Sequence, residues 1–232
     1  MEAAPPRRTP SGRVPLALRM GVDGLLSFCG SAFADVHASH FSGQTVAVDA
    51  SGWLHRGSHA CAEELALGQA CEHEKYLGYA LKMVRMLLSH GVTPLCVFDG
   101  APLPMKEATN RRRRQRRQLE LAKGRELLAQ GRKAEAFGAF AKAVSVTTKM
   151  ARRFIARLRQ MRLPYLVAPY EADAQLAFLV QQGHCAAAIS EDSDLLAYRC
   201  PATVYKLDMR GYGRLALCEN LRYAEGADRL AL

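Results

Sequence analysis

Six carboxylates follow four short apolar runs in this sequence, which read "VAV", "CVF", "YLVAPY" and "AAAIS". They are Asp49, Asp99, Glu171, Asp173, Asp192 and Asp194. If the runs are parallel strands, their carboxyl ends share one edge of a sheet, which is where ligands bind in such folds. Crowded like charges need a compensating cation, and oxygen ligands without Cys or His favour Mg²⁺ or Mn²⁺. The pattern predicts a two-metal site of the kind that hydrolyses phosphate esters.

Each of these acids also has an ordinary structural explanation. A single Asp after a strand is more often the N-cap of the next helix than a ligand, and for Asp173 or Asp194 alone the cap is favoured. The E-x-D and D-x-D spacings are weak evidence by themselves, because glycosyltransferases, phosphatases and simple turns share them. Four acidic strand ends in one chain nevertheless favour a metal site, with Glu191 as a flanking residue.

Alternating strand and helix patterns must position these acids. Short β-branched runs predict strands, and apolar residues at helical spacing predict helices that end at glycines. The segments are 45–55 and 93–100 (strands), 73–91 (helix), 163–183 and 185–198 (each a strand and then a helix), and 203–213 (an edge strand and turn). This order predicts an α/β fold with a mostly parallel central sheet flanked by helices.

The charge of the chain is unevenly distributed. The 232 residues have a net charge of +10, yet the segment 106–159 alone holds 17 Lys or Arg against four Glu. Outside that segment and the first 19 residues, the chain is net acidic. A basic segment on an acidic globule suggests a polyanion that is held by one part and worked on by another. The seven cysteines show no metal-ligand spacing, which is typical of a reduced, intracellular protein.

Composition also divides the chain. Residues 1–19 are rich in Pro and Arg, and we expect them to be disordered. Residues 20–105 and 161–232 are predicted to form one α/β domain, interrupted by a basic and largely helical excursion over 106–160. The run "RRRRQRR" at 111–117 fits a solvated helix face, a localisation signal or a disordered tag. Its place between the second and third strands favours an element that grips phosphates.

Five motifs together resemble the flap endonuclease family of structure-specific 5′ nucleases. They are "MGVDGLLSF" (20–28), "VAVDASGWLHRG" (46–57), "LLSHGVTPLCVFDGAPLPMK" (87–106), "APYEADAQLAFL" (168–179) and "EDSDLLAY" (191–198). The wording of "YEADAQLA" and "EDSDLLA" is closest to the exonuclease branch of that family. The resemblance implies a PIN-like 5′ nuclease fold with an N-terminal nuclease region (20–105), a basic helical arch insertion (106–160) and an internal nuclease region (161–232).

The function that this resemblance implies is a Mg²⁺-dependent 5′→3′ DNA exonuclease and 5′ flap endonuclease with two metal ions. Mn²⁺ is expected to substitute for Mg²⁺, and the partners are DNA with 5′ ends, nicks or flaps. The family also implies mismatch-repair proteins as partners, a nuclear location and a monomer, with no membrane. A related nuclease acting on RNA remains an alternative, because no sequence feature tests for the 2′-hydroxyl.

The family's functional residues carry over to positions of this sequence. Lys106 and Arg113 match the pair that holds the reacting phosphate and stabilises its charge. The metal ligands divide into Asp49, Asp99, Glu171 and Asp173 for one ion, and Asp192 and Asp194 for the other. The remaining arginines of the run are expected to contact DNA: Arg111, Arg112, Arg114, Arg116 and Arg117. His55 is expected near the bases where the duplex opens, although an ordinary packed or surface histidine explains it equally well.

Two features of the family have no counterpart in this sequence. The family begins at Met-Gly, whereas "MGVDGLL" starts at Met20, behind 19 further residues. A Gly-Cys-Asp-Tyr-like motif with a seventh carboxylate, and the duplex-binding helix–two-turn–helix that follows it, are not found after "KLDMRGYG". The expectation is a truncated nuclease domain that cleaves poorly or, alternatively, a catalytically weak or inactive fragment that binds DNA 5′ ends.

Overall fold

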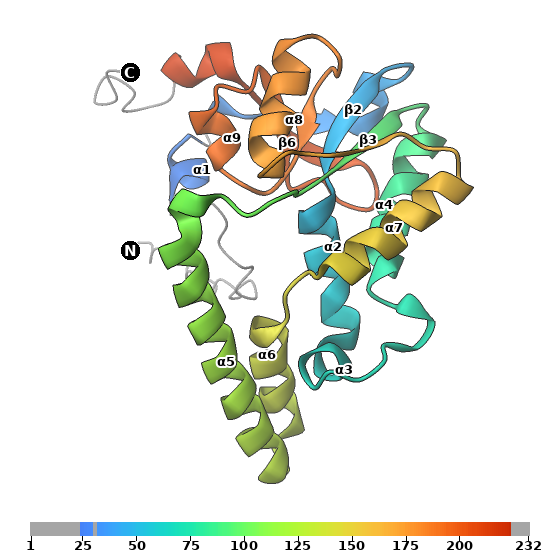
Figure 1. The fold of residues 1–232 in the computed structure, drawn as a ribbon. Helices are drawn as coiled ribbons and strands as arrows, with labels where there is room; N and C mark the ends of the chain where they lie inside the picture. Colours follow the sequence, from blue (N-terminus) through green and yellow to red (C-terminus); the bar gives the residue numbers. More distant parts are fainter. Residues whose placement is uncertain (1–23, 30–31, 224–232) are drawn as a thin grey trace, which may run out of the picture.

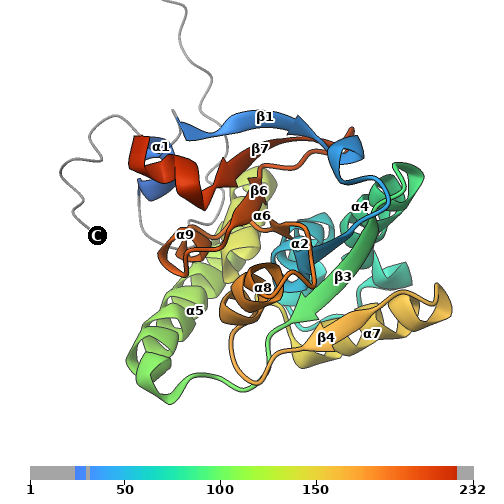
Figure 2. The ribbon, with the colours of Figure 1, turned by 90° about the horizontal axis from the view of Figure 1, so that it is seen from above.

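The centre of the fold is a seven-stranded sheet (Figures 1 and 2). The computed structural model describes residues 24–29 and 32–223, so the disorder expected for 1–19 and the role of Met20 lie outside the described residues. The strand order is β1-β7-β6-β5-β2-β3-β4. The strands are β1 (Ala34–His37), β2 (Thr45–Asp49), β3 (Thr93–Phe98), β4 (Tyr165–Val167), β5 (Ala188–Ile189), β6 (Ala202–Tyr205) and β7 (Tyr212–Leu217).

Most of the sheet is parallel, which confirms the α/β fold class. The neighbours β6, β5, β2, β3 and β4 pair in parallel, while β7 and β1 add antiparallel strands at one side. The expectation of an edge strand within 203–213 is wrong, because β6 lies between β5 and β7. The sequence "YGRLAL" after the turn at Gly211 folds back as β7, and the edge position falls to β1.

Helices cover both faces of the sheet. On one face, α2, α4 and α7 pack over Val46 and Val48 of β2, and on the other α8 packs over Ala47, because successive strand residues point to opposite faces. The sole tryptophan, Trp53, is buried in the first of these cores. The helices are α1 (Leu25–Phe28), α2 (Ala50–Ser58), α3 (Ala62–Ala66), α4 (Leu77–Ser89), α5 (Glu107–Ala129), α6 (Lys133–Ala143), α7 (Thr148–Gln160), α8 (Ala172–Gln181) and α9 (Asp194–Ala197).

Two helices project from the globule as an antiparallel pair, and we call α5 and α6 the arch (Figure 1). They pack on each other and on α3 through a small separate core that includes Ala62, Leu127 and Phe140. In contrast, α7 returns to the sheet, because Met150, Phe154 and Leu158 line one face of it and join the main core (Figure 2). The basic segment therefore splits into a projecting part and a part laid on the body.

Membrane insertion has no candidate in the part of the chain that the structure describes. Within residues 24–29 and 32–223, no helix combines the length and the apolar character needed to cross a bilayer.

Candidate active site: carboxylates at the base of the arch

Asp49 lies where β2 ends and α2 begins. One of its oxygens accepts the Gly52 N–H at 3.0 Å, which caps α2, and the other accepts the Ser190 hydroxyl at 3.3 Å. The side chain is only 5% exposed. Because an ionised carboxylate offers about four lone pairs, two of them remain free here for a cation. Asp49 can therefore cap α2 and bind a cation at the same time.

Asp99 is positioned by a close crossing of two chain segments. The Gly100 N–H donates to the Tyr170 carbonyl at 2.6 Å and the Ala101 N–H to the Pro169 carbonyl at 3.0 Å, so the loop after β3 lies on the loop after β4. A side chain at Gly100 would overlap the Ala168 carbonyl. The crossing lets Asp99 accept the backbone N–H of Ala172, the first residue of α8, at 2.9 Å.

Three aspartates approach most closely. Asp173, Asp192 and Asp194 each place a carboxylate oxygen within 4.8 Å of the others. Asp192, which is 6% exposed, also accepts the Asp194 N–H at 2.9 Å. Asp173, expected beside Asp49, Asp99 and Glu171, thus lies beside Asp192 and Asp194 as well, while the charges of Asp49 and Asp99 also act on it. Carboxylates alone make up this group, which suits a hard cation such as Mg²⁺ or Mn²⁺.

The metal-free site disfavours ionised carboxylates. Burial, reinforced by the charges of Asp49 and Asp192, raises the pKa of Asp173 to about 8. Burial also raises the pKa of Asp49 to about 6, with Asp99 and Asp192 adding to the shift and the Gly52 N–H opposing it. The pKa of Asp192 is raised chiefly by burial. A cation bound between these carboxylates would lower their pKa values again, because it favours the ionised form.

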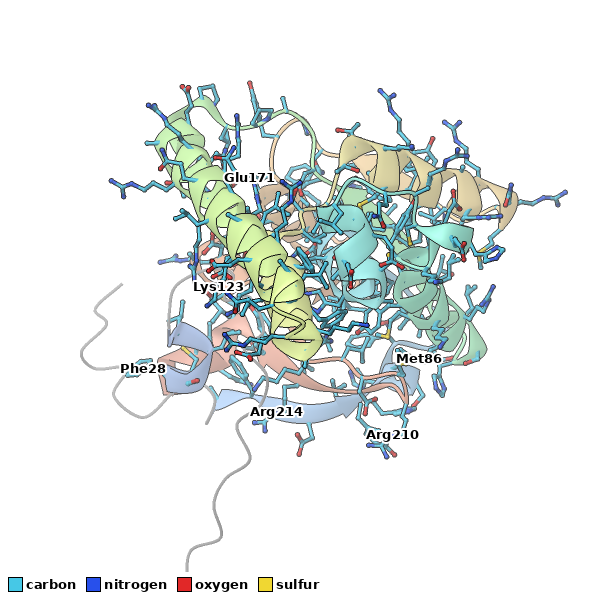
Figure 3. All side chains as sticks on the ribbon, turned by 90° about the horizontal axis from the view of Figure 1, so that it is seen from below. Phe28, Met86, Lys123, Glu171, Arg210 and Arg214 are labelled. Atoms are coloured by element: carbon cyan, nitrogen blue, oxygen red, sulfur yellow. The ribbon has the colours of Figure 1, made fainter. Side chains whose placement is uncertain are left out.

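Two cations from the start of the arch face the carboxylates. Lys106 Nζ lies 2.7 Å from Oε2 of Glu171, the residue labelled in Figure 3. This hydrogen bond is the main reason that the pKa of Lys106 is raised. Lys106 also feels the charge of Asp194, and the charges of Lys106 and Arg113 both lower the pKa of Asp192. The two residues expected to hold the reacting phosphate thus lie on the carboxylate side of the arch.

The other arginines of the run are distributed around α5. Arg117 of α5 is half-buried. The pKa of His55 is lowered to about 4, mainly by burial and then by the charges of His59 and Arg117. His55 is therefore neutral at neutral pH and packs edge-on against His59. The remaining four are exposed to solvent: Arg111, Arg112, Arg114 and Arg116.

Sequence reasoning missed the hydroxyls that hold the carboxylates. Ser51 donates to Asp99 at 2.6 Å, and Ser190 donates to Asp49 and accepts the Asp192 N–H at 3.1 Å. Ser190 links two acids whose strands are adjacent in the sheet but far apart in the sequence, so no local pattern points to it. Glu191, expected to be only flanking, faces Arg56 and the Lys206 backbone instead of the cluster.

Comparison with protein families finds two matching regions. Residues 20–120 match the XPG N-terminal domain, and residues 162–225 match the XPG I-region. The unmatched residues between the two regions comprise the second part of the arch and α7.

Similar curated proteins are exonucleases. Exonuclease 1 of Xenopus laevis is 44% identical over 208 residues, covering 87% of this chain and 28% of that protein. Exonuclease 1 of Danio rerio is 46% identical over 194 residues, covering 84% and 24%, and exodeoxyribonuclease 1 of Schizosaccharomyces pombe is 41% identical, covering 84% and 33%. These findings confirm the exonuclease branch indicated by the motifs. The chain spans about a quarter to a third of the length of these relatives.

Solved structures confirm the 5′ nuclease fold. The catalytic core of Rad2 in complex with a DNA substrate has a TM-score of 0.66 at 24% identity, covering 88% of this chain and 56% of that one. Flap endonuclease-1 from Methanococcus jannaschii has a TM-score of 0.54 at 23% identity, covering 84% and 64%. Human GEN1 in complex with Holliday junction DNA has a TM-score of 0.61 at 16% identity, covering 90% and 48%.

Proposed function

The chain belongs to the XPG family, and on that premise we propose that it is a metal-dependent DNA nuclease that hydrolyses phosphodiesters near 5′ ends. The observation that carries the proposal is the acidic group Asp173, Asp192 and Asp194, faced by Lys106 and Arg113 from the arch. Acids that bind cations, beside cations that bind phosphate, are what a phosphodiester hydrolase requires. The proposed activities are 5′→3′ exonuclease and 5′ flap endonuclease.

We propose Mg²⁺ as the cofactor, in two sites, with Mn²⁺ as a substitute. Asp173, Asp192 and Asp194 would hold one ion. Asp49, Asp99 and Glu171 would hold the other, since Asp49 and Asp99 follow the ends of the adjacent strands β2 and β3 and each keeps lone pairs beyond the hydrogen bonds that it accepts. When bound, Mg²⁺ supplies the positive charge that lowers the pKa of water and stabilises a leaving oxygen.

In this proposal Lys106 pairs with either of two groups, the Glu171 carboxylate or the reacting phosphate. Without substrate it pairs with Glu171 at 2.7 Å, and with substrate it would turn to the phosphate beside Arg113. Because Lys106 is 39% exposed, the exchange costs little desolvation. The ion pair keeps the lysine at the site and fully protonated, ready to stabilise charge on the reacting phosphate.

The arch would guide the 5′ strand. We propose that the exposed arginines of the run bind the strand's phosphates, and that Arg117 and His55 line its inner side. A neutral His55 suits contact with bases rather than with phosphates. The cellular context that we propose, by relation to exonuclease 1 proteins, is mismatch repair and recombination in the nucleus, with the chain acting as a monomer.

The decisive experiment compares two adjacent carboxylates. Asp192→Asn removes a cluster ligand, whereas Glu191→Gln removes a charge of the same sign outside the cluster. With Mg²⁺ and a 5′-recessed duplex, we expect Asp192→Asn to lose roughly 100-fold or more in cleavage rate, as when a group that stabilises transition-state charge is removed. Glu191→Gln should keep most of the rate, and both should still bind DNA. Full activity in Asp192→Asn would refute the proposed site.

Substrate class is tested in the same assay. DNA and RNA of identical sequence, labelled at the 5′ or the 3′ end, report both the sugar preference and the direction of cutting. We expect products released from the 5′ end of DNA. Faster cutting of RNA would replace the proposed substrate while leaving the metal site intact.

A further inference from the structure

A second basic surface lies outside the arch, on α7. Its thirteen residues contain five cations and no acid, and its apolar residues face the sheet, so the cations face solvent (Figure 3). The exposed cations are Lys149, Arg152, Arg153, Arg157 and Arg159. Three of them, at 149, 153 and 157, recur every fourth residue and therefore form one row along the helix.

This row borders a groove against α4. The groove has a volume of about 310 Å³, and its walls include Lys75, Arg85 and Arg157, with Leu81 and Met161 also lining it. Arg153 and Arg157 are paired with Glu74, at 3.3 and 3.2 Å. Among the residues that the structure describes, Lys75 and Arg85 have no acidic partner. After internal pairing, the groove still carries uncompensated positive charge.

The loop that forms one end of the groove is held in an unusual conformation. His73 and Glu74 are consecutive residues with φ of 53° and 51°, in the left-handed region that non-glycine residues rarely adopt. Such conformations persist where the surroundings impose them, and they gather at binding sites. Glu74 is also the residue whose carboxylate pairs with Arg153 and Arg157 of α7. The loop that carries Lys75 is therefore linked to α7 across the groove.

We propose that this groove, together with the outward face of α7, binds backbone phosphates of duplex DNA, separately from the phosphate held at the carboxylates. The inference rests on the proposed function, since it concerns the same DNA. Charge complementarity identifies the occupant: a regular row of cations matches a regular row of phosphates, and such contacts add affinity without sequence preference. The α4–α7 groove would hold the duplex, while the arch would hold the 5′ strand.

The test neutralises the two unpaired cations. Lys75→Gln/Arg85→Gln is compared with Lys206→Gln/Arg210→Gln, which removes equal formal charge from exposed residues at the turn between β6 and β7, two strands that β5 and β2 separate from β3 and β4 in the sheet order. Binding of a long, fluorescent, 5′-recessed duplex by the full chain is measured by anisotropy without divalent metal, over a range of salt concentrations. We expect the groove variant to bind several-fold more weakly at low salt, with the log–log salt slope reduced by about two. The control should stay within twofold of the unmodified chain.

Each further outcome has a definite meaning. Unchanged binding by the groove variant, or an equal loss in the control, would overturn the inference. So would a loss of the same size on single-stranded DNA, because the groove is assigned to the duplex. Phosphatidylserine vesicles and polyglutamate serve as competing polyanions; if only their binding depended on Lys75 and Arg85, the occupant would be a membrane or an acidic protein. If the chain bound duplex through the groove but never cleaved it, the proposed nuclease function would be refuted and the inference about the groove would stand.

Discussion

At the scale of residues, the carboxylates of the site accept backbone N–H groups at helix starts and keep further lone pairs for a cation. Asp49 caps α2, Asp99 caps α8 from the end of the neighbouring strand β3, and Asp192 accepts the N–H of Asp194 at the start of α9. Each backbone N–H fixes the orientation of one carboxylate oxygen, so the remaining lone pairs point in a set direction before any ion binds. A cation therefore meets ligands that are already oriented, which reduces the entropy lost on binding.

The first prediction concerns pH and the metal-free protein. The pKa of Asp173 is raised from 3.8 to about 8 and that of Asp49 to about 6, so between about pH 4 and 8 the folded chain holds protons that the unfolded chain has released. Stability should therefore fall as the pH rises through this window, by about 1.4 kcal/mol per pH unit for each such proton. Urea unfolding in EDTA from pH 5 to 8 measures it. Asp173→Asn should flatten the dependence, and a stability that rises over this range would contradict the prediction.

The second prediction concerns metal and stability. A ligand that binds only the folded state stabilises it, by about 2.7 kcal/mol at a hundred times its dissociation constant. Mg²⁺ should therefore raise the melting temperature at pH 7.5, and Asp173→Asn should lose most of that gain. Asp35→Asn is the matched control, since Asp35 is an exposed aspartate on β1 that pairs only with Arg214 among its described neighbours. An equal Mg²⁺ response in all three chains would argue against a specific site.

At the scale of elements, the arch depends on one close approach. A Cβ at Gly124 of α5 would lie 2.6 Å from the Phe140 ring of α6, so glycine lets the two helices pack tightly. Gly138 of α6, by contrast, has open space around it. The pair offers matched substitutions within one helical unit.

The third prediction follows from that difference. Gly124→Ala should destabilise the arch by roughly 1–3 kcal/mol through overpacking, whereas Gly138→Ala should stabilise its helix by about 0.5–1 kcal/mol. Hydrogen exchange of α5 and α6 amides distinguishes the two, with faster exchange expected only in Gly124→Ala. If both variants exchanged alike, the close packing of α5 on α6 would not be what holds the arch together.

The elements also show how far the sequence leads. The strands ending at Asp49 and Asp99 and the helix after Glu171 follow from local periodicity, and the structure has each of them. The sequence could not separate α7 from the arch, because both are basic and helical and only the burial of Phe154 assigns α7 to the body. It could not place Asp173 beside Asp192 either, since that proximity depends on how α8 lies on the sheet.

At the scale of the whole molecule, the two basic surfaces lie on different elements. The arch projects from the globule, while α7 lies along the sheet near β4 (Figures 1 and 2). The cations whose charges lower the pKa of Asp192 are Lys106 and Arg113, both at the start of the arch.

The fourth prediction is that the two surfaces act independently. Arg112→Gln/Arg116→Gln on the arch should weaken the binding of a single-stranded 5′ flap, and Lys75→Gln/Arg85→Gln the binding of duplex. Because distant sites with no shared partner add within about 0.5 kcal/mol, the combined variant should show the sum of both free-energy losses on a flapped duplex. Anisotropy titrations of all four chains measure it. Strong coupling between the pairs would mean that both grip the same stretch of DNA.

The order of strands has a consequence for how the protein is made. β2 is paired on one side with β5, so Asp49 meets Asp192 only after about 140 further residues have been added to the chain. A ribosome that has translated the arch but not β5 carries a polypeptide that has the arginine run and lacks Asp192 and Asp194. Ribosome-bound chains arrested before residue 188 should accordingly show no metal-dependent cleavage. On the proposed function, the strand order would therefore delay hydrolysis until β5, Asp192 and Asp194 have been translated.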